Sequence, residues 1–276
     1  MSDRFWERLF PAGATLVGMV HLQPLPGSPR WGGSMAAVLS RAERDATALV
    51  DAGFDAVLVE NYGDVPFAAG TVGPETVAAL TAAVGAVRSA VDVPVGVNVL
   101  RNDVEAAVAI AAATGARFVR ANVHTGSMWT DQGLVEGRAA GTLRLRAALG
   151  VEVALLADVH VKHATPPPGA SLEDAAADAW HRGLADALLV TGTATGAATR
   201  LDDVSTVRAH VPRAPVLVAS GVTEETVADV LDRASGAIVG SAVMHDGTAG
   251  SGVDPGRAAA LVARGRGPAR GKHAPR

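Results

Sequence analysis

The chain of 276 residues is 49% hydrophobic, 19% charged and only 4% aromatic, with a net charge of −4 and no cysteine. This composition excludes a disordered chain, disulfides and zinc–thiolate sites, and an acidic body with few aromatic residues argues against nucleic acid as a partner. No apolar run reaches the ~20 residues that span a bilayer, and the first residues lack the apolar core of a signal peptide. We therefore expect a cytoplasmic protein without integral membrane association.

Eight times along the chain, an apolar run is followed by a loop and then by an alanine-rich helical stretch. The strands are expected at Thr15–His21, Ala56–Glu60, Val95–Val99, Phe118–Val123, Val153–Val159, Ala187–Val190, Val216–Ala219 and Ala237–Val239. The helices are expected at Ser34–Asp51, Pro74–Ala90, Asp103–Thr114, Ala139–Leu149, Leu172–Arg182, Asp203–His210, Glu224–Arg233 and Pro255–Arg264. The expected N-caps are Ser34, Asn102, Ser171, Asp202 and Thr223.

Continuous apolar strands that alternate with helices indicate a parallel sheet covered by helices. Eight such units without a linker predict an α/β fold of the (β/α)8 TIM-barrel type. An open, doubly wound sheet is the alternative, but no G-x-G-x-x-G follows the first strand. We expect one domain over residues 1–263 and a disordered basic tail over residues 264–276, which holds five Lys/Arg and no acidic residue.

The segment Val153–His163, VALLADVHVKH, changes from apolar to polar at Asp158. Asp158, His160 and Lys162 follow at every second position, and in an extended chain this period places their side chains on one face. Burying three such groups together is costly unless they serve chemistry. Lys162 is one of only two lysines in the chain, and only an amine readily loses its proton. The alternative is a strand end that reaches solvent.

The working surface of a TIM barrel lies at the carboxyl ends of its strands, where Glu60 also falls. Glu60 and Asp158 can act as base or acid, and His160 as general acid/base. Lys162 can form a Schiff base or stabilise an enolate, and we favour electrostatic stabilisation. Glu60, Asp158 and His160 can alternatively hold a divalent metal ion, although no H-E-x-x-H motif is present. The catalytic candidates are Glu60, Asp158, His160 and Lys162.

Other strand ends carry residues suited to binding a substrate, and we assign this role to His21, Asn98, Asn122 and Thr191. His124 is equally a loop histidine or a catalyst. Arg101 and Arg120 either bind a second anion or form structural ion pairs. The segment Thr191–Ala197, rich in threonine and glycine, either adds donors or forms a mobile lid.

The last two strands end in VASGVTEET and AIVGSAV. Glycine lets backbone N–H groups approach an anion, the hydroxyls of Ser220, Thr223 and Ser241 add donors, and a helix starting near Thr223 adds its dipole. Turns after the last two strands are where many TIM barrels bind phosphate. The predicted phosphate-binding residues are Ser220, Gly221, Gly240 and Ser241. The alternative is two tight turns without a ligand.

Two connections, His21–Gly33 and Asn122–Gly137, are longer than typical βα loops. Their Trp31, Met128 and Trp129 provide apolar cover for a bound substrate or, alternatively, a contact between subunits of a homo-oligomer.

The segments HLQPLPGSP, VENYGDVPF, ADVHVKHA, RGLADALLVTGTATG and GAIVGSAV, in this order, resemble the BtpA family over about Thr15 to Val262. The resemblance implies a TIM barrel akin to the ribulose-phosphate-binding barrels. The family name implies a membrane-extrinsic role in photosystem I biogenesis. The chain departs from the family after strand eight, where it reads SAVMHDG instead of carrying a lysine.

These features predict a cytoplasmic enzyme that acts on a small phosphorylated sugar or nucleoside-derived compound by isomerase or lyase (aldolase-like) chemistry. The alternative is a non-catalytic assembly or stability factor of the photosystem I biogenesis type, acting at a membrane surface. That alternative predicts an exposed apolar or basic patch and a collapsed pocket at the strand ends.

Overall fold

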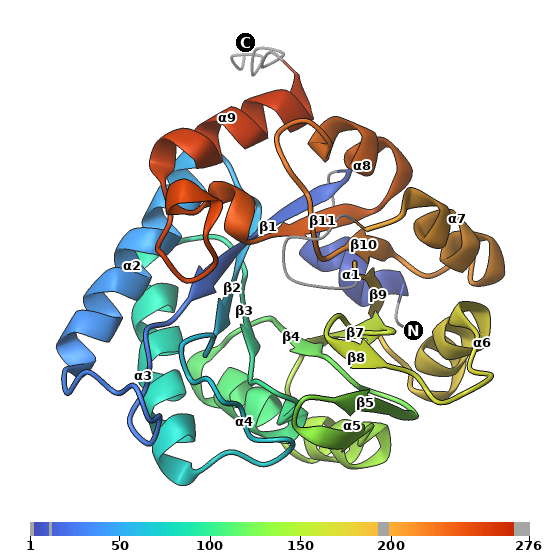
Figure 1. The fold of residues 1–276 in the computed structure, drawn as a ribbon, viewed down its shortest axis with the longest axis horizontal. Helices are drawn as coiled ribbons and strands as arrows, with labels where there is room; N and C mark the ends of the chain where they lie inside the picture. Colours follow the sequence, from blue (N-terminus) through green and yellow to red (C-terminus); the bar gives the residue numbers. More distant parts are fainter. Residues whose placement is uncertain (1–2, 11–12, 193–198, 268–276) are drawn as a thin grey trace.

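The computed structural model describes residues 3–10, 13–192 and 199–267. Within them, eight parallel strands close into a barrel, and helices form a ring around it (Figure 1). The predicted TIM barrel is confirmed. In barrel order the strands are β1 (Thr15–His21), β2 (Ala56–Glu60), β3 (Val95–Asn98), β4 (Phe118–Ala121), β7 (Ala154–Val159), β9 (Ala187–Val190), β10 (Val216–Val218) and β11 (Gly236–Val239).

The helices of the ring follow their strands much as the sequence predicted. They are α2 (Met35–Ala52), α3 (Pro74–Ala90), α4 (Val104–Thr114), α5 (Ala139–Ala148), α6 (Leu172–Ala177, continued by the π-helical turn Asp178–Arg182), α7 (Leu201–His210), α8 (Val227–Arg233) and α9 (Pro255–Arg266).

Two of the predicted N-caps are confirmed, because the hydroxyls of Ser34 and Ser171 each accept a hydrogen bond from a first-turn N–H group. The prediction for Asn102 is wrong, and Asp103 caps α4 instead. The Asn102 amide is used elsewhere, since it both donates to and accepts from the backbone of Val123, at 2.9 Å each. This pair ties the loop after β3 to the loop after β4.

The other two N-cap predictions are also wrong. Asp202 lies inside the first turn of α7, which begins at Leu201, and there its charge favours the positive end of the helix. The Thr223 hydroxyl lies 3.3 Å from the Thr226 hydroxyl within a turn, and α8 begins only after this turn, at Val227.

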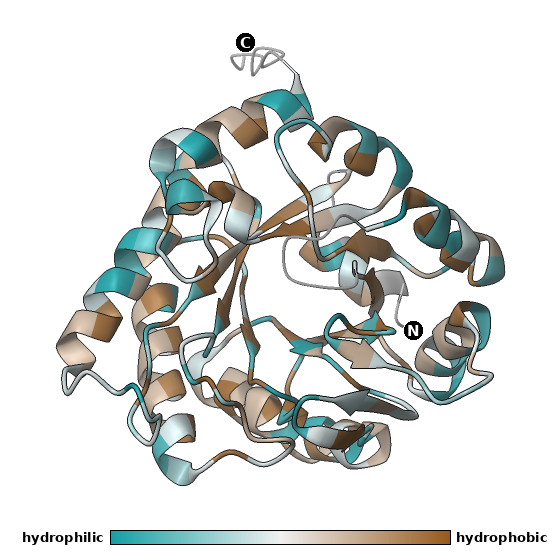
Figure 2. Ribbon diagram, viewed as in Figure 1, coloured by the Kyte–Doolittle hydropathy of each residue, from teal (hydrophilic) through white to brown (hydrophobic). Residues whose placement is uncertain are grey.

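The barrel interior and the space between barrel and helices are both apolar, and the barrel strands are mostly brown in Figure 2. Successive side chains of each strand alternate between these two regions. In β7, for example, Ala154 and Leu156 fill the interior, whereas Leu155 packs toward the helices. Phe118 occupies the interior fully buried next to Gly96, where any side chain would collide with its ring.

A short N-terminal helix, α1 (Asp3–Leu9), was not predicted from the sequence. Its Trp6 packs against Phe10 with ring centroids 4.6 Å apart, and Phe10 meets Phe118 edge-on at 6.2 Å. All three rings belong to the interior core. Helix α1 therefore closes the amino-terminal end of the barrel with aromatic side chains and leaves the opposite end for a site.

The connection Asn122–Gly137, expected to be a loop, contains the hairpin β5 (Ser127–Thr130) and β6 (Gly133–Glu136). Strand β8 (Ala164–Thr165) pairs with β5 and completes a small antiparallel sheet. Met128 is buried in this sheet's own cluster, whereas Trp129 is 56% exposed. Two cavities lie at the carboxyl ends of the barrel strands, and neither Met128 nor Trp129 lines them. The expected apolar cover over a substrate therefore does not form there.

At the carboxyl end of the chain, α9 continues through Arg266, so residues 264–266 of the predicted tail are helical. The rest of the predicted tail, from residue 268, lies outside the described residues, as does the segment 193–198. No helix in the described ranges has the length and apolar character needed to cross a membrane.

Candidate active site

The inward-facing positions of the strands change from apolar to polar at one end of the barrel. Met19 in β1 and Leu58 in β2 belong to the interior core, and two residues later the same strands end in His21 and Glu60. His21 pairs in register with Glu60, and Glu60 with Asn98 of β3. The period of two therefore places these groups in one buried layer above the apolar core.

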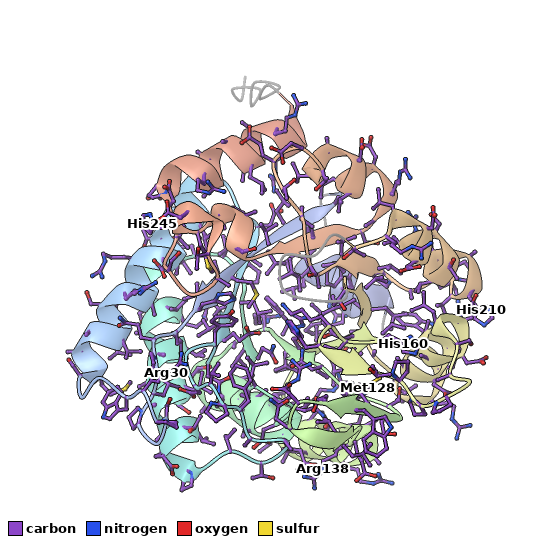
Figure 3. All side chains as sticks on the ribbon, in the orientation of Figure 1. Arg30, Met128, Arg138, His160, His210 and His245 are labelled. Carbon is purple, nitrogen blue, oxygen red and sulfur yellow. The ribbon has the colours of Figure 1, made fainter. Side chains whose placement is uncertain are left out.

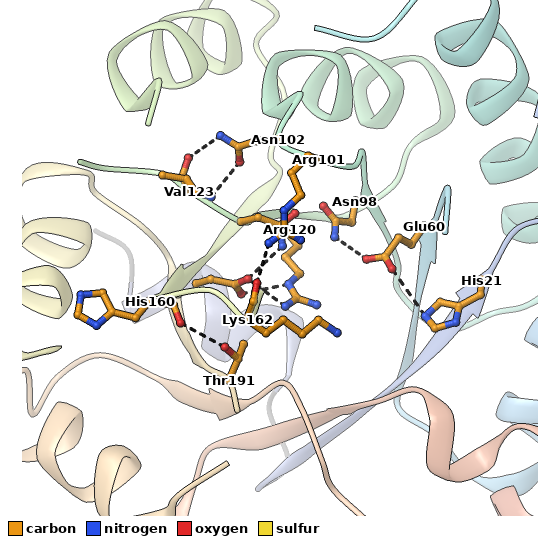
Figure 4. A network of polar contacts seen from close by, with 12 residues as sticks. His21, Glu60, Asn98, Arg101, Asn102, Arg120, Val123, His160, Lys162 and Thr191 are labelled. Atoms are coloured by element: carbon orange, nitrogen blue, oxygen red, sulfur yellow. Dashed lines mark hydrogen bonds and ion pairs between the residues drawn. The ribbon is translucent and has the colours of Figure 1, made fainter. Parts of the chain in front are cut away.

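Glu60 is fixed by two neighbours. Asn98 donates from Nδ2 to Glu60 Oε2 at 2.6 Å, and His21 Nε2 lies 3.6 Å from Oε1 (Figure 4). Asn98 is 1% exposed and its amide donates to this carboxylate. Asn98 therefore orients Glu60. The Glu60 side chain lines both cavities described below.

The protonation state of His21 follows from its contacts. The Gly250 N–H donates to His21 Nδ1 at 3.1 Å, so Nδ1 is the acceptor nitrogen and the ring hydrogen lies on Nε2, facing Glu60. Burial lowers the pKa of His21 to about 4, with Glu60 partly opposing the shift. The ring also stacks on Tyr62, with centroids 4.2 Å apart and planes 10° apart. His21 is therefore a neutral, oriented donor at physiological pH.

The deepest charges of the layer form a bidentate ion pair. Arg120 donates from Nε and Nη2 to the two oxygens of Asp158, at 3.0 and 2.9 Å, and Asn122 Nδ2 adds a third bond to Oδ2 at 3.0 Å. The Asp158 side chain is fully buried and Arg120 is 2% exposed. Asp158 thus neutralises and orients Arg120, which itself lines the cavities.

Lys162 extends into the mouth of the barrel toward the side where Glu60 and His21 lie (Figure 4). Strand β8 begins two residues later and pairs with β5, which holds this segment in place. Burial lowers the pKa of Lys162, and the nearby cation Arg120 lowers it further, while Glu60 acts in the opposite direction. The amine is therefore easier to deprotonate than an exposed lysine.

The two predicted phosphate turns meet these charged groups in one small cavity, called here the first cavity, with a volume of about 30 Å³. Its polar lining consists of His21, Glu60, Arg120, Lys162, Ser220, Gly221, Gly240 and Ser241. Gly221 has φ of +65°, a conformation that other residues rarely adopt. The expected dipole contribution from α8 is absent, because this helix has only seven residues and begins at Val227.

A second cavity, with a volume of about 450 Å³, adjoins the first and shares Glu60, Arg120 and Lys162 with it. The remaining walls are aromatic, aliphatic and charged, formed by Tyr62, Val65, Phe67, Leu100, Arg101, Asn122, Asp131 and His163. The mouth of the barrel therefore has two connected compartments with the reactive groups between them.

His160 does not join the layer. Strand β7 ends at Val159 and His160 has φ of +53°, so the extended alternation that would place His160 beside Asp158 and Lys162 is interrupted. Its ring points away from Lys162 (Figure 4) and toward α6 (Figure 3), where it lines another cavity together with Asp174. Thr191 donates to the His160 carbonyl at 3.3 Å and holds this turn, away from both cavities of the mouth.

The expected metal ligands do not converge. Among the described residues, no three His, Asp or Glu side chains lie close enough to hold a metal ion. Asp158 is engaged with Arg120, and His160 faces elsewhere. For His124, the sequence allowed either a loop histidine or a catalyst. Its side chain is buried, 2% exposed, and Nε2 hydrogen-bonds the Gly183 carbonyl at 2.7 Å, as expected of a histidine that holds a loop.

Sequence reasoning missed Tyr62 and the backbone N–H of Gly250, which together orient His21. Tyr62 is the single tyrosine of the chain and follows a strand end by two residues, a signal that could have been used. No sequence pattern connects Gly250 to His21, because 229 residues separate them.

The fold and the mouth define a TIM-barrel protein with a buried, charged site at the carboxyl ends of its strands. The sequence model of the BtpA family matches residues 13–266, and the chain belongs to this family. It is 44% identical over 247 residues to the photosystem I biogenesis protein BtpA of a Synechocystis strain, covering 90% of this chain and 86% of that protein.

Solved structures show the same fold at low sequence identity. A tryptophan synthase chain from Mycobacterium tuberculosis superimposes with a TM-score of 0.61 at 22% identity, covering 96% of this chain and 98% of that chain. N-(5'-phosphoribosyl)anthranilate isomerase from Pyrococcus furiosus superimposes with a TM-score of 0.56 at 15% identity, covering 92% and 98%. At these identities the likeness concerns the fold alone.

Proposed function

We propose that this protein is an enzyme that binds a small phosphorylated sugar or nucleoside-derived compound and moves a proton on it, as an isomerase or a lyase. One observation supports this proposal above the others: the two glycine–serine turns line the same cavity as Glu60, His21 and Lys162. A phosphate bound at the turns would hold the rest of the molecule among these groups, and such fixed placement can supply much of the rate enhancement.

Each group has a role in this proposal. Glu60, oriented by Asn98, takes a proton from a carbon next to a carbonyl and later returns it. The Lys162 ammonium, which lines the same cavity as Glu60, stabilises the negative charge that develops on the carbonyl oxygen, and the neutral His21, whose Nε2–H faces Glu60, helps to orient that carboxylate. Asp158 acts through Arg120 and has no direct contact with substrate. The fold likeness to an isomerase named for a phosphoribosyl compound is consistent with this assignment, as an analogy.

The test separates chemistry from phosphate binding. Purified protein is incubated in D2O with aldose and ketose phosphates, and exchange of substrate protons is followed by NMR. Glu60→Gln should abolish exchange and leave the thermal stabilisation by the same sugar phosphate intact. Gly240→Ala should weaken that stabilisation, because it adds a methyl group beside the turns; its Cβ would lie 3.5 Å from Met19 and 3.6 Å from His21, ordinary contacts that let the variant fold.

Glu152→Gln, on a glutamate whose side chain is 71% exposed, serves as the matched control and should change neither readout. The proposal is wrong if no sugar phosphate stabilises the protein, or if exchange continues in Glu60→Gln at the rate of the unchanged protein.

A second candidate is an assembly factor at a membrane surface, which the name of the Synechocystis relative suggests. The observation in its favour is the hairpin, where Trp129 (56% exposed) and Leu134 (44% exposed) face each other across β5 and β6. Co-sedimentation with vesicles that is lost in Trp129→Ser would support it. A homo-oligomer that buries this hairpin would instead appear as a change of mass in the same variant.

A further inference from the structure

The second cavity is lined by a buried arginine, Arg101. Arg101 is 5% exposed and forms no ion pair within the described parts of the chain. Its Nη2 donates to the Lys162 carbonyl at 2.6 Å, and its buried Nε has no hydrogen-bond partner. Burying a guanidinium in this way is costly, because its hydration is lost without a replacement.

The other charges of the mouth do not satisfy Arg101. Asp158 is occupied by Arg120, and Glu60 by Asn98 and His21. Asp131 lies on the exposed turn of the hairpin, where it accepts a hydrogen bond from Gln132. The Arg101 side chain lines a large cavity that is open to a ligand.

Asn122 provides a second unused polar atom in the same wall. Its Nδ2 donates to Asp158, which fixes the orientation of the amide, and its buried Oδ1 has no partner. Arg101 and Asn122 both line this cavity, with Tyr62 and Phe67 as apolar walls. A carboxylate or phosphate bound in the cavity would give the Arg101 guanidinium a counter-ion.

We infer that the substrate has two anionic ends: a phosphate held by the two glycine–serine turns, and a carboxylate or second phosphate held by Arg101 in the second cavity. The reacting carbons lie between them, beside Glu60 and Lys162, the residues common to both cavities. This inference rests on the phosphate-binding function proposed above and narrows the substrate class, because a sugar with a single anionic group at the turns would leave Arg101 without a counter-ion.

The test compares ligands that differ only at the second end. Dissociation constants are measured by calorimetry for 6-phosphogluconate against sorbitol 6-phosphate, which has an alcohol in place of the carboxylate, and for ribulose 1,5-bisphosphate against ribulose 5-phosphate. The first pair tests whether the second cavity binds a carboxylate, and the second pair tests whether it binds a phosphate. We expect at least one of the doubly anionic compounds to bind about 10- to 100-fold more tightly than its partner, the gain typical of a charged hydrogen bond.

Arg101→Met should remove this preference and leave the affinity for the singly phosphorylated partner unchanged within about two-fold. Arg101→Lys should restore part of it, because the positive charge returns, and Arg144→Met, on an exposed arginine of α5, should have no effect. The wild-type comparison needs no variant, so the inference stays testable if Arg101→Met fails to fold.

The two proposals fail in different ways. Equal binding of both members of each pair, weakened by Gly240→Ala, would overturn the second anionic end and leave the phosphate-binding proposal standing. No measurable binding of any of the four compounds would overturn both. A preference that survives in Arg101→Met would also overturn the role of Arg101.

Discussion

Breaking the buried pair between Arg120 and Asp158 should destabilise the protein strongly. Asp158→Asn replaces a carboxylate that accepts three hydrogen bonds by an amide, whose NH2 group must face donors of Arg120 or Asn122. Because Arg120 is 2% exposed, its charge would stay buried without a counter-ion. Removing one partner of such a pair costs about 3–5 kcal/mol of the free energy of unfolding.

The assay is equilibrium urea unfolding at pH 7, followed by circular dichroism. Asp178→Asn is the matched control, because its pair with Arg182 is exposed (57% and 82%) and should contribute less than about 1 kcal/mol. The double variant Arg120→Met/Asp158→Leu removes both charges and should recover most of the loss, apart from the orphaned Asn122 donor. A loss below about 1 kcal/mol in Asp158→Asn would refute the reasoning.

Two further predictions concern His21 and the packing of β3. Since burial holds the folded-state pKa of His21 at about 4, below its ordinary value of 6.5, its contribution to stability is complete above pH 6.5 and is lost as pH falls toward 4, by up to about 3 kcal/mol. His21→Gln should flatten this part of the urea-midpoint profile; an unchanged slope would contradict the assignment. Gly96→Ala places a methyl group against the Phe118 ring and should cost about 1–3 kcal/mol, whereas Gly85→Ala in α3, with no atom nearby, should raise the melting temperature slightly. Equal melting temperatures for the two alanine variants would contradict the packing argument.

Local sequence patterns were sufficient to predict the barrel and the end of it where the candidate site lies. Apolar runs of strand length, each followed by an amphipathic or alanine-rich helix, can bury their side chains only in a parallel sheet covered by helices. The alternation of side chains then requires that His21, Glu60 and Asn98 face inward at the strand ends, because the residues two positions earlier already do. The glycine–serine turns after β10 and β11 were located on the same basis.

Which charged groups pair with one another, and which remain available, depends on contacts between distant segments. His160 was expected beside Lys162 because a period of two was assumed to continue, but the strand ends at Val159 and a left-handed residue redirects the chain. Asp158 is occupied by Arg120, and Arg101 has no ion pair among the described residues, because β4, β7 and the loop after β3 converge there. Such contacts join residues 38 or more positions apart, and local propensity carries no information about them, because the side chains meet only once the barrel has closed.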